Sequence, residues 1–249
     1  MVRNRQPSVN SVDSTRVASP RRGAANRWAA AVRHLRRVDP HLRAIIDRIG
    51  PCRLEPHTDR FSALVRSIIS QQISTKAAQS INARLVALGG EPHQPARLIE
   101  IGEATLRTVG LSSAKARYVL NLAEAVASRQ VPLDEFDDSW DDEAITQSLT
   151  SIKGIGVWTA EMFLIFVLNR PDILPTSDLG VRVGLRNRHG LVELPRPRDC
   201  HSLAEMWRPY RTIASWYIWK GADTPVARPS PPMPEVTRTP SRRKRRPSS

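Results

Sequence analysis

Residues 149–180 read LTSIKGIGVWTAEMFLIFVLNRPDILPTSDLG, and the interpretation of the whole chain starts from this stretch. The segment 152–156 is too short for a loop with its own core, but it suits a tight turn between two helices. Gly154 and Gly156 are its informative positions, because glycine permits positive φ and lets the backbone approach a ligand with no Cβ in the way. The amides of this turn can therefore point at a phosphate at the start of the next helix.

The helix that follows the turn is predicted for residues 157–169, and Pro171 stops it. The chain then reaches Asp178, which precedes a further predicted helix at 179–188. A carboxylate at a helix N-terminus interacts favourably with the dipole and with free amides, so Asp178 is expected to be held as a carboxylate. The ordinary role of such a residue is an N-cap.

These features resemble the hairpin of the helix-hairpin-helix DNA glycosylase superfamily, and the resemblance is closest to 3-methyladenine DNA glycosylase II and its relatives. It is carried by the Gly-x-Gly turn, by Trp158-Thr159-Ala160 and by the segment 174–180. The resemblance implies an all-α fold in which two helical subdomains flank a cleft, with Asp178 as the essential aspartate. Relatives often carry an extra β-rich N-terminal domain, for which this chain has no room.

Charge is concentrated at the two ends of the chain. The 249 residues carry a formal net charge of +14 and are 40% apolar, which is enough for a core in one or two domains. Residues 1–25 contain five arginines and one aspartate, and residues 222–249 contain seven basic and two acidic residues. These ends can attract a polyanion, although solvated extensions are the ordinary reading. The acidic run 134–142 is expected away from DNA, with Asp141 or Asp142 favouring the dipole of the following helix.

The two cysteines, Cys52 and Cys200, lie far apart and in no Cys-x-x-Cys spacing. They are expected to be buried thiols, and neither a zinc site nor an iron-sulfur cluster is predicted. No metal or organic cofactor is implied. No apolar run approaches the roughly 18 residues that span a bilayer, and no apolar signal core begins the chain. The sequence therefore predicts a soluble intracellular protein of the bacterial cytoplasm, associated with the nucleoid through DNA, with no membrane partner.

Three regions are expected: a disordered basic tail at 1–23, a helical domain at 24–221 that contains the hairpin at 149–160, and a disordered Pro/Arg-rich tail at 222–249. Within the domain, apolar spacing predicts helices on either side of Asp39-Pro40, two in 59–89 joined at 70–74, two short ones in 94–109, and others at 113–129, 142–151, 157–169, 179–188 and 207–219, with a Pro-rich connection at 189–200.

Two adjacent glutamines, Gln71 and Gln72, lie between predicted apolar helices and need partners for their amides. In the superfamily this turn delivers a side chain into the duplex gap left by an extruded base. Gln72 matches that side chain and Gln71 lies alongside, while a pair that caps the helix ends is the alternative. Lys115 matches the family's Gly-Leu-x-x-x-Lys-Ala element and is expected near phosphates, an exposed lysine being the alternative. Lys153 of the hairpin is also expected at phosphate.

Excision of a base breaks an N-glycosidic bond through an oxocarbenium-like sugar, which needs negative charge near C1′ and a water to capture the cation. Asp178 can serve both needs. Asp172 directly follows Pro171 and is expected to cap or to form a salt bridge. Where relatives commonly carry a second acid before the catalytic one, this chain has Ser177, so general-acid assistance from that position is absent.

The resemblance also implies a pocket for the extruded base. Trp158 and Trp219 are expected to stack on a cationic purine, while Trp207 and Trp216 are expected in the core. Met162 stands where 3-methyladenine DNA glycosylase II usually has a tyrosine, which leaves the substrate range open.

The hairpin residue Trp158 separates two mechanisms. Bifunctional superfamily members carry a lysine at this position, which attacks C1′, and tryptophan has no amine for that attack. The nearby Thr159 is expected among the DNA contacts. The predicted function is therefore a monofunctional, monomeric glycosylase for alkylated purines such as 3-methyladenine and 7-methylguanine in double-stranded DNA. The alternatives are excision of uracil, hypoxanthine or mismatched bases, and a catalytically inactive DNA-binding protein.

Overall fold

Helices form all of the regular structure in the computed structural model within the residues that it describes, 27–223. The predicted tails at 1–23 and 222–249 lie outside this range, apart from residues 222 and 223. The α-helices are α2 (Ala29–Val38), α3 (Pro40–Ile49), α4 (Arg60–Ser70), α5 (Thr75–Gly89), α6 (Pro95–Thr108), α7 (Ser113–Ala127), α8 (Asp142–Thr150), α9 (Val157–Phe166), α10 (Leu179–His189), α11 (Pro197–Leu203) and α12 (Arg211–Asp223), with 3-10 turns η1 (Leu133–Glu135) and η2 (Glu205–Trp207).

Side-chain caps mark where several helices begin. Ser74 accepts a hydrogen bond from the Ala77 amide at 3.2 Å at the start of α5, and Ser112 accepts one from Lys115 at 3.3 Å at the start of α7. Asp141 caps α8 by accepting from Ala144 at 2.6 Å. Each cap satisfies an amide that has no partner within its own helix, so the helix boundaries follow directly from these residues.

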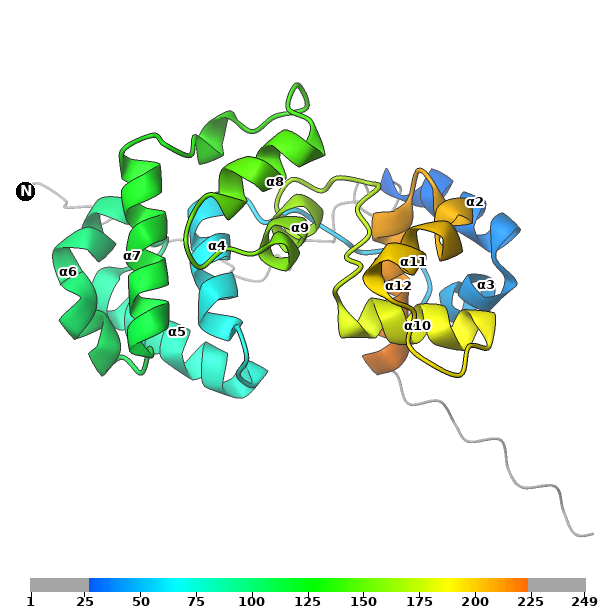
Figure 1. The fold of residues 1–249 in the computed structure, drawn as a ribbon, viewed down its shortest axis with the longest axis horizontal. Helices are drawn as coiled ribbons and strands as arrows, with labels where there is room; N and C mark the ends of the chain where they lie inside the picture. The colour runs from blue at the N-terminus through cyan, green and yellow to red at the C-terminus, as the bar shows by residue number, and fades with distance from the viewer. Residues whose placement is uncertain (1–26, 224–249) are drawn as a thin grey trace, which may run out of the picture.

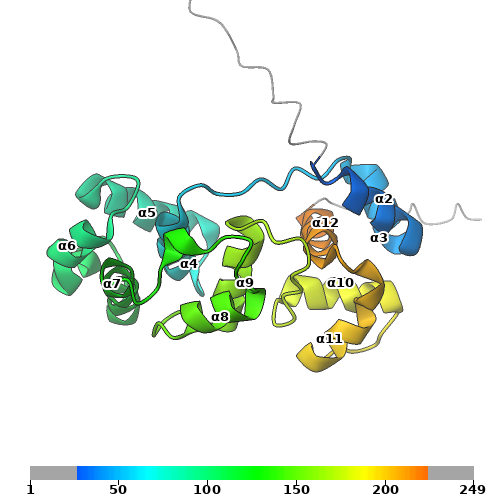
Figure 2. The same cartoon turned by 90° about the horizontal axis from the view of Figure 1, so that it is seen from above.

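The helices gather into two lobes (Figure 1). One lobe contains α4 to α9, and the other combines α2 and α3 from the beginning of the chain with α10, α11 and α12 from its end (Figure 1). Two connections join the lobes, residues 50–59 and residues 167–178 (Figure 2). This arrangement confirms the predicted all-α fold with two helical subdomains.

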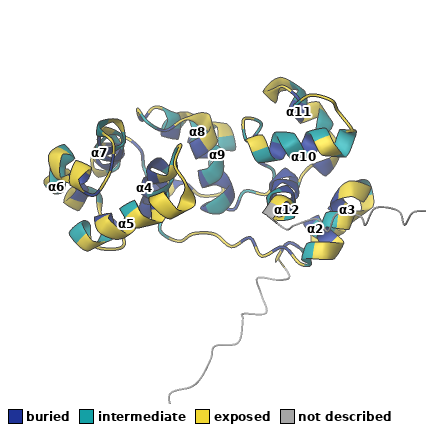
Figure 3. Cartoon of the chain, turned by 90° about the horizontal axis from the view of Figure 1, so that it is seen from below, coloured by how far each residue is buried: buried dark blue, intermediate teal, exposed yellow. Residues whose placement is uncertain are grey.

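Apolar faces pack inside each lobe, and α12 is the most deeply buried helix of the second one (Figure 3). Its residues 211–218 are all buried, and the Tyr217 hydroxyl donates to the Gly50 carbonyl at 2.8 Å. Trp207 and Trp216 are buried as predicted, and so are the free thiols of Cys52 and Cys200.

Asp39 ties the two ends of the chain together in the second lobe. The fully buried carboxylate caps α3, accepts from the Trp207 indole at 2.7 Å and pairs with Arg188 of α10. Burial alone would raise the pKa of Asp39, but the hydrogen bonds from Trp207 and Leu42 and the charge of Arg188 hold it below its ordinary value. A charge buried with this many partners fixes α2 and α3 against α10.

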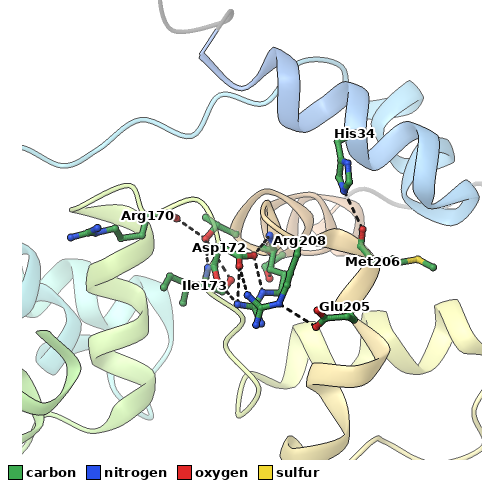
Figure 4. A network of polar contacts seen from close by, with 10 residues as sticks. His34, Arg170, Asp172, Ile173, Glu205, Met206 and Arg208 are labelled. Carbon is green, nitrogen blue, oxygen red and sulfur yellow. Dashed lines mark hydrogen bonds and ion pairs between the residues drawn. The ribbon is translucent and has the colours of Figure 1, made fainter. Parts of the chain in front are cut away.

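A second ionic network fastens the connection 167–178 to the start of α12 (Figure 4). Asp172 accepts from Arg211 at 2.8 Å and from Arg208 at 2.7 Å, which confirms its predicted role as a salt-bridging group. The Thr212 hydroxyl donates to the Arg170 carbonyl at 2.7 Å. These contacts position the chain on its way to Asp178.

The structure differs from the sequence-based expectation in three helices. The helix predicted at 207–219 is divided, because Trp207 belongs to η2 and α12 begins only at Arg211 and ends at Asp223. The helix α9 ends at Phe166 rather than near residue 169, because Asn169 adopts a left-handed conformation (φ 60°) and the Arg170 amide turns back to Leu164. The helix α11 begins inside the segment predicted as a Pro-rich connection. Pro197 stands at its first position, where the missing amide proton costs no hydrogen bond.

Candidate active site

A cleft of about 700 Å³ opens where the two lobes meet. It collects most of the residues that the sequence singled out, and its walls come from four separate segments of the chain. Its walls are formed by Gln71 and Gln72 of the α4–α5 turn, Tyr118 of α7, Gly154, Ile155 and Gly156 of the hairpin, Trp158 and Thr159 of α9, and Ser177, Asp178 and Leu179 at the start of α10.

Asp178 is half-buried in this cleft, and its carboxylate is held by three N–H donors. One oxygen caps α10 by accepting from the Val181 amide at 3.0 Å and also accepts from the Trp219 indole at 2.9 Å. The other oxygen accepts from the Trp158 indole at 3.1 Å. Trp158 belongs to one lobe and Trp219 to the other, so the carboxylate joins both sides of the cleft.

A glycine in α10 makes room for this arrangement. A Cβ at Gly180 would lie 3.0 Å from Cδ1 of Trp219 and 3.1 Å from the Asp178 carboxylate. One turn later, a Cβ at Gly184 would lie 2.4 Å from Ile218, so α10 and α12 approach closely along this face. Sequence reasoning missed both glycines, whose spacing of four residues places them on one side of the helix.

The structure gives a different reason for glycine at each of the two hairpin positions. Gly154 has φ +110°, and a Cβ there would lie 2.2 Å from the ring of Tyr118. Gly156 has φ −96° and no atom within 4 Å of a Cβ, so it faces open space. Of the two reasons expected for glycine in this turn, positive φ therefore applies to Gly154 and not to Gly156, where the close approach of a ligand stays a prediction.

Gly156 is also the N-cap of α9, and no side chain caps this helix. Its first-turn amides thus have no side-chain acceptor, as expected of an anion-binding helix start, and Gly156, Trp158 and Thr159 line the cleft. The hairpin itself is anchored from α7, where Asn121 donates to the Lys153 carbonyl at 3.0 Å.

The two glutamines of the α4–α5 turn separate in role. Gln71 donates to the Gly154 carbonyl at 3.2 Å and so links this turn to the hairpin. Gln72 is exposed at the tip of the turn with φ +56°, a left-handed conformation that is uncommon outside glycine. Backbone strain of this kind is often kept at functional sites.

Lys115 does not extend freely toward a phosphate. Its ammonium donates to the carbonyls of Ile69 at 2.7 Å and Gln71 at 2.6 Å, and burial lowers its pKa. It therefore caps the C-terminal end of α4 and shapes the turn that presents Gln72. The lysine is therefore not the exposed side chain of the ordinary alternative, and a contact with phosphate stays a prediction.

A second, mostly apolar cavity of about 500 Å³ lies between α4, α5 and α9. Trp158 and Thr159 line both cavities, and Met162 and Phe166 continue the wall of the second. Trp219 lies outside this wall and stacks on Phe166, with ring centroids 5.7 Å apart. Of the three predicted pocket residues, Trp158 and Met162 thus share a cavity, and Trp219 contacts the carboxylate instead.

One acidic residue near the site was not among those singled out from the sequence. Glu161 lies one turn after Trp158, and its Oε2 atom is buried with no hydrogen-bond partner. Burial and the nearby charge of Asp178 raise the pKa of Glu161 to about 7. Its signal in the sequence is a single acid within the apolar helix VWTAEMFLIF.

Within residues 27–223, no three His, Cys, Asp or Glu side chains gather into a group suited to a metal ion. Over the same residues, none of the helices has the length and apolar character needed to cross a bilayer.

Comparison with known proteins agrees with this geometry. DNA-3-methyladenine glycosylase 1 of Schizosaccharomyces pombe is 34% identical over 192 residues, covering 75% of this chain and 84% of the relative. The alkylbase DNA glycosidase-like protein mag2 of the same organism is 31% identical, covering 78% of this chain and 93% of the relative. The solved 3-methyladenine DNA glycosylase of Schizosaccharomyces pombe in complex with abasic DNA superposes with a TM-score of 0.70 at 32% identity, covering 79% of this chain and 98% of that one.

A family of known proteins also matches more than half of this chain. Residues 65–209, from α4 through the hairpin and Asp178 to η2, match the family described as "HhH-GPD superfamily base excision DNA repair protein". The chain therefore belongs to the HhH-GPD superfamily of base excision DNA repair proteins.

Proposed function

We propose that this chain is a monofunctional DNA glycosylase that acts as a monomer on double-stranded DNA and releases alkylated purines such as 3-methyladenine and 7-methylguanine. The observation that carries the proposal is the Asp178 carboxylate, held in the cleft between the lobes by indoles from both sides. Relatives named as 3-methyladenine glycosylases support the substrate class.

Asp178 supplies the charge that the reaction needs. As the C1′–N bond lengthens, its electron pair moves to the departing base and the sugar becomes cationic, so a fixed anion nearby stabilises the transition state. A carboxylate offers about four lone-pair positions, and three N–H donors occupy Asp178. The remaining position orients a water, whose oxygen bonds to C1′ while its proton passes to the carboxylate and then to solvent.

The surrounding elements hold the DNA. The uncapped start of α9 binds a backbone phosphate, and the exposed Gln72 fills the space that an extruded base leaves in the duplex. The extruded base lies against Trp158 and Met162, on the apolar wall that they share. A cationic purine gains cation-π attraction to the indole and leaves as a neutral base, so it requires no general acid.

Base release from methylated duplex DNA tests the proposal. Wild-type protein should release 3-methyladenine, and Asp178→Asn, which keeps the size and can still cap α10, should lower the single-turnover rate about a hundredfold or more while retaining DNA binding. Asp138→Asn, at an exposed aspartate of the acidic run, is the matched control and should behave as wild type. Wild-type rates in Asp178→Asn would refute the assigned role.

Two further measurements address the alternatives. Duplexes with uracil or hypoxanthine report whether a different base is preferred, and absence of release from every substrate would favour an inactive DNA-binding protein. Because Trp158 offers no amine for attack on C1′, borohydride should trap no covalent complex. Sedimentation analysis of the free protein tests the monomer.

A further inference from the structure

Glu161 lies beside the proposed active site without a partner of its own. It shares a face of α9 with Trp158, whose indole binds Asp178, because residues three apart are neighbours on a helix. Its Oε2 atom is buried and accepts no hydrogen bond, and no ion pair involves Glu161 in the part of the chain that the structure describes. A half-buried carboxyl group with one buried oxygen and no donor is costly in its charged form, so this position needs an explanation.

Asp178 is the charged group near α9 whose charge influences the Glu161 carboxyl group, because the other charged side chains around this helix have partners elsewhere. Besides the connection to α10, the helices α4 and α8 pack against α9, and their charged groups are engaged elsewhere. These engagements are Arg60 with the Leu133 carbonyl, Arg66 with Glu91, Asp142 with Arg170, and Glu143 with Gln147. At the start of α10, Arg182 donates to the Pro195 carbonyl.

Two carboxyl groups close together in a partly desolvated place do not both ionise easily. Burial comes first and the Asp178 charge second among the causes that bring the pKa of Glu161 to about 7. The interaction is mutual: an ionised Glu161 places a second negative charge next to Asp178.

We propose that Glu161 is a positioning residue. Its ionisation state decides how much negative charge acts, together with Asp178, on the cationic sugar. With the proton in place Asp178 supplies the one negative charge of this pair, and with the proton lost the pair carries two. This inference rests on the proposed glycosylase function.

The second charge favours the transition state more than the ground state, because positive charge develops on the sugar as the bond breaks. At an effective dielectric near 20 to 40, one added negative charge in a partly desolvated site is expected to change the rate by about tenfold. The phosphates of bound DNA add negative charge and oppose ionisation, so the step in the rate is expected somewhat above the pKa of the free protein.

The test is the pH dependence of 3-methyladenine release from methylated duplex DNA, measured between about pH 5.5 and 9 with protein in excess. Wild type should show a rate that rises with pH by about tenfold across the ionisation of Glu161. Glu161→Gln keeps the size of the side chain without the charge and should stay on the low-pH plateau. Glu161→Asp restores a carboxyl group and should restore a step. Glu193→Gln, at an exposed glutamate in the α10–α11 loop, should keep the wild-type profile.

The outcomes separate the two proposals. A step in wild type and in Glu161→Asp that is absent from Glu161→Gln supports the inference. Release with the same profile in wild type and Glu161→Gln overturns it and leaves the proposed function standing. No release by wild type at any pH overturns the proposed function, and the inference falls with it. Thermal melting of each variant verifies that the rates come from folded protein. If Glu161→Gln has a lowered melting temperature, the step restored in Glu161→Asp still tests the inference.

Discussion

The hairpin glycines offer a pair of substitutions that the structure predicts to act in opposite ways. Alanine at Gly154 would meet Tyr118 at 2.2 Å while the backbone holds φ at +110°, a region that L-residues avoid. Alanine at Gly156 would meet nothing within 4 Å at an ordinary φ of −96°. The first change should therefore damage the fold, and the second should leave the fold intact and place a methyl group where a phosphate approaches.

The magnitudes follow from these distances. At Gly154, backbone strain of about 1–2 kcal/mol adds to about 1–3 kcal/mol for forcing an extra carbon into packed surroundings. The sum is about 3 kcal/mol, which lowers the melting temperature by about 10 °C for a domain of this size. At Gly156 the cost to stability is about 1 kcal/mol or less, because alanine is a poorer N-cap than glycine.

Binding reverses the order of the two effects. One hydrogen bond from a backbone amide to a charged phosphate contributes about 1.5–3 kcal/mol, so losing it at Gly156 weakens affinity about tenfold or more. Fluorescence anisotropy with a duplex carrying an abasic-site analogue measures this, and urea unfolding measures stability. The slope of affinity against salt should not change, because no cationic side chain is removed.

Two results would refute this reasoning. If Gly154→Ala unfolds at the urea concentration of wild type, contact with Tyr118 does not shape the hairpin. If Gly156→Ala is folded and binds the duplex as tightly as wild type, the amides at the start of α9 do not hold a phosphate.

Three further substitutions test other parts of the structure. Asp39→Asn should lower the free energy of unfolding in urea by about 3–5 kcal/mol, because it leaves Arg188 without its buried partner. Since the pKa of Asp39 is lowered in the folded protein, the stability that the wild-type carboxylate provides should be lost as pH falls below about 3.8. Equal stability of both proteins at pH 7 would contradict this. Gly180→Ala should reduce base release with little change in melting temperature, because its Cβ displaces the Trp219 indole 3.0 Å away, and an unchanged rate would count against the indole as a holder of the carboxylate. Because the pKa of Glu161 is raised to about 7, its ionisation destabilises the fold as pH rises from about 4.5 to 7, so Glu161→Gln should melt as wild type does at pH 4 and above wild type at pH 8.

Much of the helical framework could be predicted because local signals specify it. Caps such as Ser112 and Asp141 stand directly before apolar-periodic segments, and the helix starts follow them. The pair of short helices in 94–109 corresponds to α6, which bends at Gly102 with φ +72°. The helix α11 was missed because Pro197 reads as a breaker, although a proline at the first helical position fits without strain.

The site was only partly predictable, since its details depend on contacts between distant segments. The resemblance to the glycosylase superfamily implied that Asp178, Trp158 and Gln72 belong to one site, and in the structure they line one cleft. Lys115 caps α4 from a helix 44 residues away from Gln71, and no local pattern indicates such a contact. The environment of Glu161 likewise arises only when α9 packs beside the start of α10.

The division of one lobe between both ends of the chain has a consequence for synthesis. The helices α2 and α3 leave the ribosome before the other helices that the structure describes, yet α12, which packs on α3 and donates from the Tyr217 hydroxyl to the Gly50 carbonyl, is made after all of these. Contacts so far apart in the chain form slowly because the intervening segment must first be brought together. The α4–α9 lobe is continuous and is expected to fold while translation proceeds, with the early helices waiting unpartnered. Proteolysis of ribosome-bound chains that stop before residue 211 would then cut at α2 and α3 and spare the continuous lobe.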